Sequence, residues 1–139
     1  MTYEEWFLKQ GELHANVMKK LVNKTDDEVI EYFRFENMVK NEPDFCPLYK
    51  DNKKCHDYEK LNCYLCACPN FRFKMEGFEK TEDGKTLFSV CNIKSKDGAQ
   101  YIGEDYIHQN CSGCIVPHRE KYIKNHFNRN WFEVMKDVR

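Results

Sequence analysis

The chain has 139 residues and a formal net charge of −1, so its length fits one domain and its charge balance does not favour a nucleic-acid-binding protein. No stretch approaches the roughly 20 consecutive apolar residues of a membrane-spanning helix. Acidic side chains outnumber basic ones over residues 1–45, and the reverse holds over residues 117–139. The two ends of the chain would therefore pack against each other with complementary charge, or their charged faces would simply be solvated.

The compartment follows from the N-terminus and the cysteine content. The opening MTYEEWFLKQ begins with acidic residues and has neither the basic start nor the apolar run of a secretory signal. Eight cysteines are several times the ordinary usage for such a length. We expect a cytoplasmic protein with reduced thiols, in which clustered cysteines are metal ligands rather than disulfides.

Two helices are predicted in the first part of the chain. Thr2 and Glu5 have the spacing of a capping box, and apolar residues then recur at the helical period to about residue 22. Thr25 and Glu28 repeat the capping signal, and the second helix must end before Pro43. The short connection predicts an antiparallel pair.

Turn signals and a final apolar stripe follow. The segment FRFKMEGFEKTEDGKTLFSVCNI, residues 71–93, alternates around Asp83-Gly84, which is typical of a β-hairpin turn. Asp97-Gly98 predicts a second turn before a short strand at residues 100–102. Pro117 can begin a last helix. Its apolar stripe would be Ile123, Phe127, Trp131, Val134 and Val138.

These elements predict an α+β fold in a single domain. Residues 1–42 would be the helical N-terminal extension, with its antiparallel helix pair. Residues 43–118 would be a cysteine-rich metal-binding core with a short β-hairpin or small sheet, and residues 119–139 a C-terminal helix.

The cysteine spacing is the strongest chemical signal. Two C-x-x-C knuckles, Cys63/Cys66 and Cys111/Cys114, let two sulfurs in a tight turn reach one tetrahedral ion at about 2.3 Å. Four such thiolates would complete one site. Cys68 would then point to a different ion, with Cys46, Cys55 and Cys91 as its candidate companions. The candidate metal ligands are Cys46, Cys55, Cys63, Cys66, Cys68, Cys91, Cys111, Cys114 and His118.

The spacing leaves the grouping of these ligands open. His118 and His56 could each replace a thiolate. Alternatively, His118 only forms a hydrogen bond in the first turn of a helix, and His56 faces the solvent. The thiols could also be buried without any metal, although two knuckles argue against it.

The motifs FCPLYKDNKKCH, NCYLCACP and NCSGCIVPH occur in this order between Phe45 and His118. This stretch resembles the cysteine-rich small domain family, a probable metal-binding family. The resemblance implies metal binding without an established reaction. It places Cys55, Cys63, Cys66, Cys68, Cys111, Cys114 and His118 on the family's characteristic positions and Cys46 and Cys91 on looser ones. The segment from residue 70 to residue 110 is longer than the family's usual connection.

Three functions follow from these ligands. The first is a small metal-binding protein with structural zinc-like sites, acting as a protein-interaction or carrier module for another protein. The alternative is an iron–sulfur protein for electron transfer or cluster delivery, because a 4Fe-4S cluster also takes four thiolates. A metal-dependent enzyme is third. The sequence contains no Gly-rich phosphate loop, GxSxG or HExxH motif, so we expect no catalytic residues.

Overall fold

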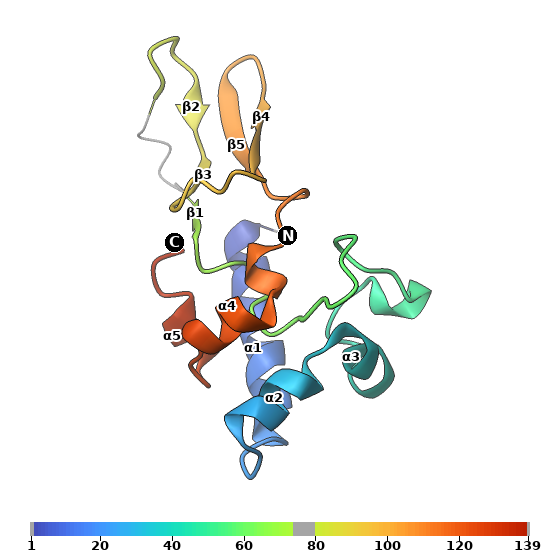
Figure 1. Cartoon of the computed structure of the whole chain (residues 1–139). Helices are drawn as coiled ribbons and strands as arrows, with labels where there is room; N and C mark the ends of the chain where they lie inside the picture. Colours follow the sequence, from blue (N-terminus) through green and yellow to red (C-terminus); the bar gives the residue numbers. More distant parts are fainter. Residues whose placement is uncertain (1, 74–79, 139) are drawn as a thin grey trace.

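The computed structural model describes residues 2–73 and 80–138. It consists of a helical body and an elongated arm of strands that projects from one end of the body (Figure 1). The body contains α1 (Tyr3–Lys19), α2 (Asp26–Tyr32), α3 (Phe35–Asn41), α4 (Glu120–Asn125) and α5 (Trp131–Val134), with 3-10 turns at Tyr49–Asp51 and Val116–His118. The mixed α+β class is confirmed.

The arm, residues 71–73 and 80–110, is built from two small sheets. In one, β1 (Phe71–Phe73) pairs antiparallel with β3 (Ser89–Cys91). In the other the order is β2-β5-β4, with β2 (Thr86–Leu87) parallel to β5 (Tyr106–Asn110) and β4 (Ala99–Ile102) antiparallel to it.

Both predicted turns are present in the arm. Gly84 has a φ of 83°, which a glycine adopts without strain, and its N–H donates to the carbonyl of Thr81. Gly98 closes the second turn by donating to the carbonyl of Ser95. Residues 74–79 of the predicted hairpin lie outside the described residues.

The capping boxes begin the first two helices as predicted. Thr2 accepts a hydrogen bond from the N–H of Glu5, whose side chain accepts one from the N–H of Thr2. Thr25 and Glu28 make the same reciprocal pair at the start of α2. Each pair satisfies two of the N–H groups that a helix start leaves without partners.

The prediction of one helix from Thr25 to the residues before Pro43 is wrong, because the chain breaks at Arg34. Arg34 is extended, with φ −61° and ψ 140°. It forms an isolated antiparallel bridge with Asn62. Tertiary pairing with the segment before Cys63 therefore overrides the helical pattern and separates α2 from α3.

The single C-terminal helix over residues 119–139 is also wrong. The chain leaves the helical conformation between α4 and α5, where Asn128 accepts a hydrogen bond from the N–H of Asn130 and Asn130 caps α5 by accepting one from Phe132. Asparagine side chains compete with helical hydrogen bonds in this way. The carbonyl of Asn128 is also taken by the hydroxyl of Tyr64, at 2.5 Å.

The core lies where α1, α2, α5 and the segment around Tyr64 meet. Phe7, Phe33, Tyr64 and Trp131 are almost fully buried there. The ring of His14 stacks on Phe33 with centroids 5.0 Å apart. Among the elements, α1 packs most closely against α5, so the two ends of the chain share one core.

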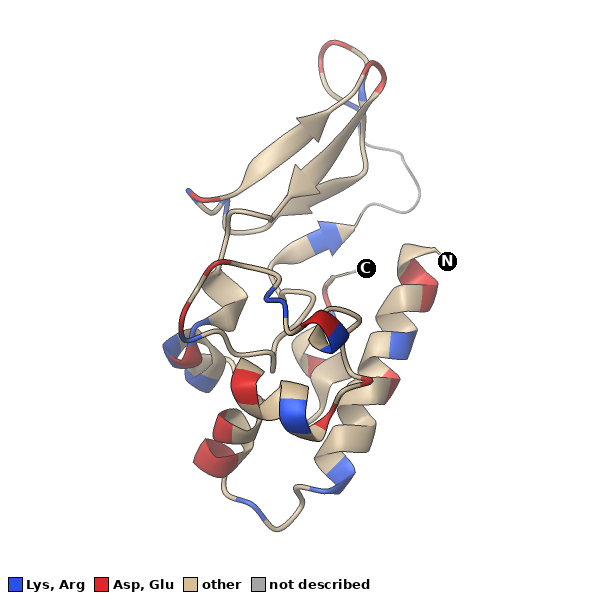
Figure 2. Ribbon diagram, turned by 90° about the vertical axis from the view of Figure 1, so that its right-hand side faces the viewer, with Lys and Arg blue, Asp and Glu red and all other residues tan. Residues whose placement is uncertain are grey.

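Of the two alternatives for the charged ends, the structure bears out contact between them. Arg129 pairs with Asp26 at 2.8 Å and Lys124 with Asp27 at 3.6 Å. These pairs are largely exposed and contribute little to stability. Figure 2 shows the charged residues on the helices and at the turns of the arm, whereas β2 to β5 carry none. Within the described residues no helix is long and apolar enough to span a membrane.

Gly11 should be intolerant of a side chain. A Cβ there would lie 2.1 Å from a ring carbon of Phe132. Overpacking typically costs about 1–3 kcal/mol, which exceeds the roughly 1 kcal/mol that alanine gains in a helix. Gly11→Ala should therefore lower the urea midpoint.

The clash can be tested by compensation. The double variant Gly11→Ala/Phe132→Leu should lose less unfolding free energy than the two single variants lose together, because the ring that clashes is gone. Lys9→Ala, on the exposed face of α1, is the control and should change stability by less than about 0.5 kcal/mol. Full additivity in the double variant would show that Phe132 does not cause the effect.

His14 should make folding sensitive to acid. Burial lowers its pKa from 6.5 to about 4, which the backbone of Tyr64 offsets only in part. Below the unfolded pKa only the unfolded state takes up the proton, so stability is full above about pH 6.5 and falls as the pH approaches 4. The loss between about pH 7.5 and pH 5 should be about 2 kcal/mol.

His14→Phe keeps a ring in the stack and should remove this part of the pH dependence. The measurement is the urea midpoint at both pH values, with the exposed His126 changed to Phe as control. Equal pH slopes in wild type and His14→Phe would contradict the prediction.

Candidate metal centres

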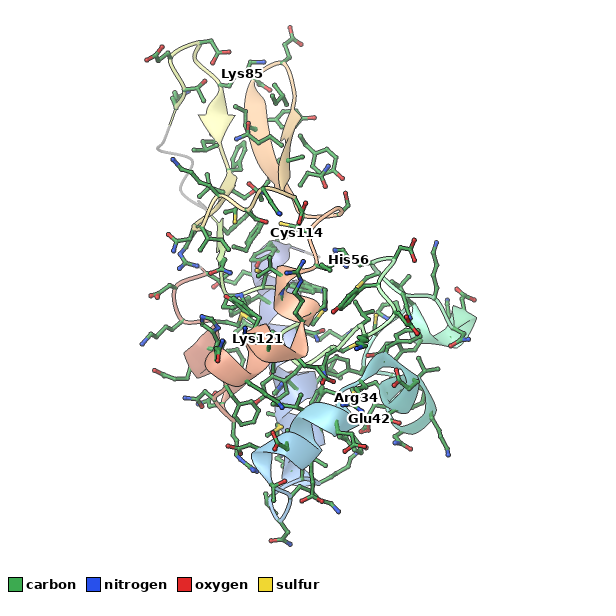
Figure 3. All side chains as sticks on the ribbon, in the orientation of Figure 1. Arg34, Glu42, His56, Lys85, Cys114 and Lys121 are labelled. Atoms are coloured by element: carbon green, nitrogen blue, oxygen red, sulfur yellow. The ribbon has the colours of Figure 1, made fainter. Side chains whose placement is uncertain are left out.

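Figure 3 labels Cys114 and His56 at the waist between the helical body and the arm, and six of the eight cysteines, including Cys114, line one cavity together with His56. None is in a disulfide. Cys63 and Cys114 are buried, Cys55 is exposed, and the remaining five are half-buried: Cys46, Cys66, Cys68, Cys91 and Cys111.

Both predicted knuckles are tight turns. The N–H of Cys66 donates to the carbonyl of Cys63 at 3.3 Å, and Cys114 donates to Cys111 at 3.0 Å. Cys68 follows directly, and its φ of 45° is positive. Ala67, which lies between Cys66 and Cys68, also has a positive φ, 90°, so the backbone is left-handed at both residues after the first knuckle.

Four thiols form the first thiol group: Cys46, Cys55, Cys63 and Cys66. Burial raises the pKa of Cys66, and the thiols of Cys63, Cys55 and Cys46 raise it further. Burial also raises the pKa of Cys63 to about 12, with smaller contributions from Cys55 and Cys46. Cys66 thus lies close enough to the other three sulfurs for them to oppose its ionisation.

The other four form the second thiol group: Cys68, Cys91, Cys111 and Cys114. Burial raises the pKa of Cys68 to about 11, and Cys111, Cys114 and Cys91 add to the shift. Burial, then Cys114 and Cys91, raises the pKa of Cys111. The second thiol group thus combines Cys68, which follows the first knuckle, with Cys91 of the arm and with the second knuckle.

The spacing left the grouping open, and the structure places the two knuckles in different thiol groups. Cys68 lies near Cys111 and Cys114 and, of its three candidate companions, near Cys91. The two cysteines of a knuckle meet within one turn of the chain. Which other thiols lie beside them depends on how the arm folds back on the body.

Hydrogen-bond donors lie against several sulfurs. Backbone N–H groups of Ala67 and Asn70 favour the charged forms of Cys66 and Cys68. The N–H of Ser95 donates to the Cys91 sulfur at 3.5 Å, and the Ser95 hydroxyl lies 3.2 Å from the sulfur of Cys114. Such donors stabilise a thiolate more than a neutral thiol.

Two histidines lie beside Cys55. His118 is buried, its Nδ1 is 2.9 Å from the carbonyl of Asn62 and its Nε2 is 3.8 Å from the Cys55 sulfur. His56 is half-buried, whereas one alternative from the sequence had it facing the solvent. Its Nδ1 is 3.1 Å from the same sulfur. We name Cys55, His56 and His118 the Cys55 triad.

The Cys55 triad has the closest convergence of donor atoms. Within residues 2–73 and 80–138, it is the group of three or more whose ligand atoms all lie within 4.8 Å of one another. Burial lowers the pKa of His118 to about 4, so its ring is neutral, as a metal ligand must be. Two imidazoles therefore lie beside one of the eight thiols, that of Cys55.

A cavity of about 320 Å³, the thiol cavity, lies between the two thiol groups. All the thiols except Cys46 and Cys63 line it, together with both histidines of the Cys55 triad. Tyr3 and Trp6 of α1 close one side. The cavity thus lies against every candidate centre.

Sequence reasoning missed the asparagine that precedes each knuckle. Asn62 accepts a hydrogen bond from the N–H of Tyr64 at 2.9 Å, and Asn110 accepts one from Ser112 at 3.0 Å. Both are turns closed by an asparagine side chain. The signal was present in the sequence, because both knuckles read Asn-Cys-x-x-Cys.

Comparisons of the chain with models of protein families, with characterised proteins and with solved structures give no match.

The two asparagines should differ in their contribution to stability. Asn62 is fully buried and also donates to the carbonyl of Ile30 at 2.8 Å. Asn62→Ala removes this buried bond and the side-chain acceptor of the Tyr64 N–H, and should cost about 1–3 kcal/mol. Asn110→Ala removes only the exposed local bonds from the N–H and the hydroxyl of Ser112, and should cost less than about 1.5 kcal/mol. Urea unfolding of both variants measures the difference, and equal losses would contradict it.

Proposed function

We propose that the protein binds metal ions through its cysteines in two four-thiolate centres, one in each thiol group. The observation that carries the proposal is the division of the eight thiols into two groups of four, with N–H and O–H donors against the sulfurs. A buried thiol such as Cys66, whose ionisation three neighbouring sulfurs oppose, would need a cation to become a thiolate.

Zinc is the ion that the donor set favours, since closed sulfur-rich sites with no redox role are typical of structural zinc. The resemblance of the three cysteine motifs to the cysteine-rich small domain family points the same way. On this proposal the centres form a scaffold, and the protein acts as an interaction or carrier module for another protein.

The surface that supports a protein partner is the arm. Four of its large apolar side chains are exposed: Ile93, Tyr101, Ile102 and Tyr106. Strand β4 lies at the edge of its sheet and is exposed along its whole length. A partner's strand can pair with such an edge.

An iron–sulfur protein is the second candidate. All four thiols of the second group line the thiol cavity, whose volume of about 320 Å³ leaves room beyond a single ion. A 4Fe-4S cluster takes four thiolates. Anaerobic purification separates the candidates, because a cluster gives a brown protein with iron and sulfide, whereas the zinc protein is colourless.

Paired substitutions test the two centres. Cys63→Ser/Cys66→Ser and Cys111→Ser/Cys114→Ser should each remove the metal of one centre and lower the melting temperature, because structural zinc contributes on the order of 10 kcal/mol in small domains. Combining all four substitutions should remove both contributions. Metal content per chain is measured by elemental analysis, with the exposed Lys121 changed to Ser as control.

The outcomes discriminate between arrangements. If both knuckles shared one site, the second pair of substitutions would remove nothing beyond the first. Unchanged metal content in both double variants would reject metal binding by the knuckles altogether.

A further inference from the structure

The Cys55 triad has the geometry of a ligand set for a single ion. Its sulfur and two nitrogens lie within 4.8 Å of one another, and the sulfur is 3.1 Å from Nδ1 of His56 and 3.8 Å from Nε2 of His118. Ligands at 2.0–2.3 Å from a tetrahedral ion lie about 3.5 Å apart. Small side-chain movements would therefore bring all three atoms onto one ion.

Hydrogen bonds orient both rings for this role. Nε2 of His56 lies 3.0 Å from the carbonyl of Cys111, and Nδ1 of His118 lies 2.9 Å from the carbonyl of Asn62. A carbonyl oxygen can only accept, so these two nitrogens carry the protons. The nitrogens that face Cys55 are consequently the ones with free lone pairs. Metal-bound histidines are usually held by a hydrogen bond of this kind.

The surroundings leave one side of the Cys55 triad open. All three residues line the thiol cavity, and Cys55 is the exposed cysteine of the eight. The lining is mostly apolar, with Tyr3, Trp6 and Phe71 among its residues. A volume of about 320 Å³ lies within the range of small-molecule sites.

We propose that the Cys55 triad binds a further divalent ion of the zinc type, with its fourth coordination position open to the thiol cavity. Three protein ligands and one exchangeable position distinguish such a site from a closed structural one. Cys55 belongs to both the triad and the first thiol group, so its sulfur bridges the two ions. This bridging role of Cys55 rests on the proposed function, because it requires the four-thiolate centre in the first thiol group.

The open position selects a class of ligand. A zinc ion with sulfur and nitrogen ligands accepts another soft or borderline donor, and the apolar cavity favours a compact apolar body behind that donor. The ligand is therefore a small organic thiol with an apolar body.

The number of retained ions tests the site. Reduced protein is loaded with Zn²⁺ without oxygen, passed through a desalting column and analysed. Wild type should retain about three ions per chain, and His56→Ala about two, since one of three ligands is lost. Adding imidazole to His56→Ala should restore the third ion. His126→Ala, at an exposed histidine that stacks on Tyr122, is the control and should retain about three.

The open position is tested with Co²⁺ in place of Zn²⁺. Thiophenol should change the visible spectrum of the wild-type protein and leave that of His56→Ala unchanged, and thioglycolate, which carries a charge, should bind more weakly. His118→Gln should behave as His56→Ala does. Circular dichroism checks that each variant is folded, and the half-buried position of His56 makes its variant the safer one.

The results separate the two proposals. About two ions in wild type and in His56→Ala alike, or a Co²⁺ spectrum indifferent to thiophenol, would overturn the triad site while leaving the four-thiolate centres in place. No retained ion in any variant would overturn the proposed function as well.

Discussion

The hydrogen bonds of residues 61–63 hold the fold together at the point where the thiols gather. Cys63 donates to the carbonyl of Phe33 at 2.8 Å, and Asn62 donates to the carbonyl of His118 at 3.2 Å. One short segment therefore fixes the break between α2 and α3 and the start of the C-terminal part. Both thiol groups depend on it, because it leads directly into the segment that supplies thiols to each of them.

The arm has little apolar core of its own. Among its strands, Ile107 is the large apolar side chain that is buried, and small sheets without a buried face are marginal in stability. The arm meets the body through Phe73, which donates to the carbonyl of Val138 at 2.7 Å, and through the second thiol group. That group contains one thiol from the body and the others from the arm and its exit, so a metal ion bound there would tie the arm to the body.

Local signals in the sequence predicted local structure well. Both capping boxes form, and the turns at Gly84 and Gly98 are where the dipeptides placed them. The predictions of two long helices were wrong where a tertiary contact competes with the helical pattern. Arg34 leaves the helix to pair with Asn62, and the side chains around Asn128 turn the chain between α4 and α5. An apolar stripe indicates which residues are buried, but it does not indicate where the backbone leaves the helical conformation.

The same distinction applies to the candidate centres. The knuckles were predictable because Cys63 and Cys66 meet within one turn, whereas the pairing of Cys68 with Cys91 depends on the path of the whole arm. The donors against the sulfurs are again local, since Ser95 lies in the turn that follows Cys91. Burial raises the pKa of Cys68, and the backbone N–H of Asn70 offsets only part of that shift. If the protein binds metal as we propose, the ion would supply the positive charge that offsets the rest of the desolvation cost of such a thiolate.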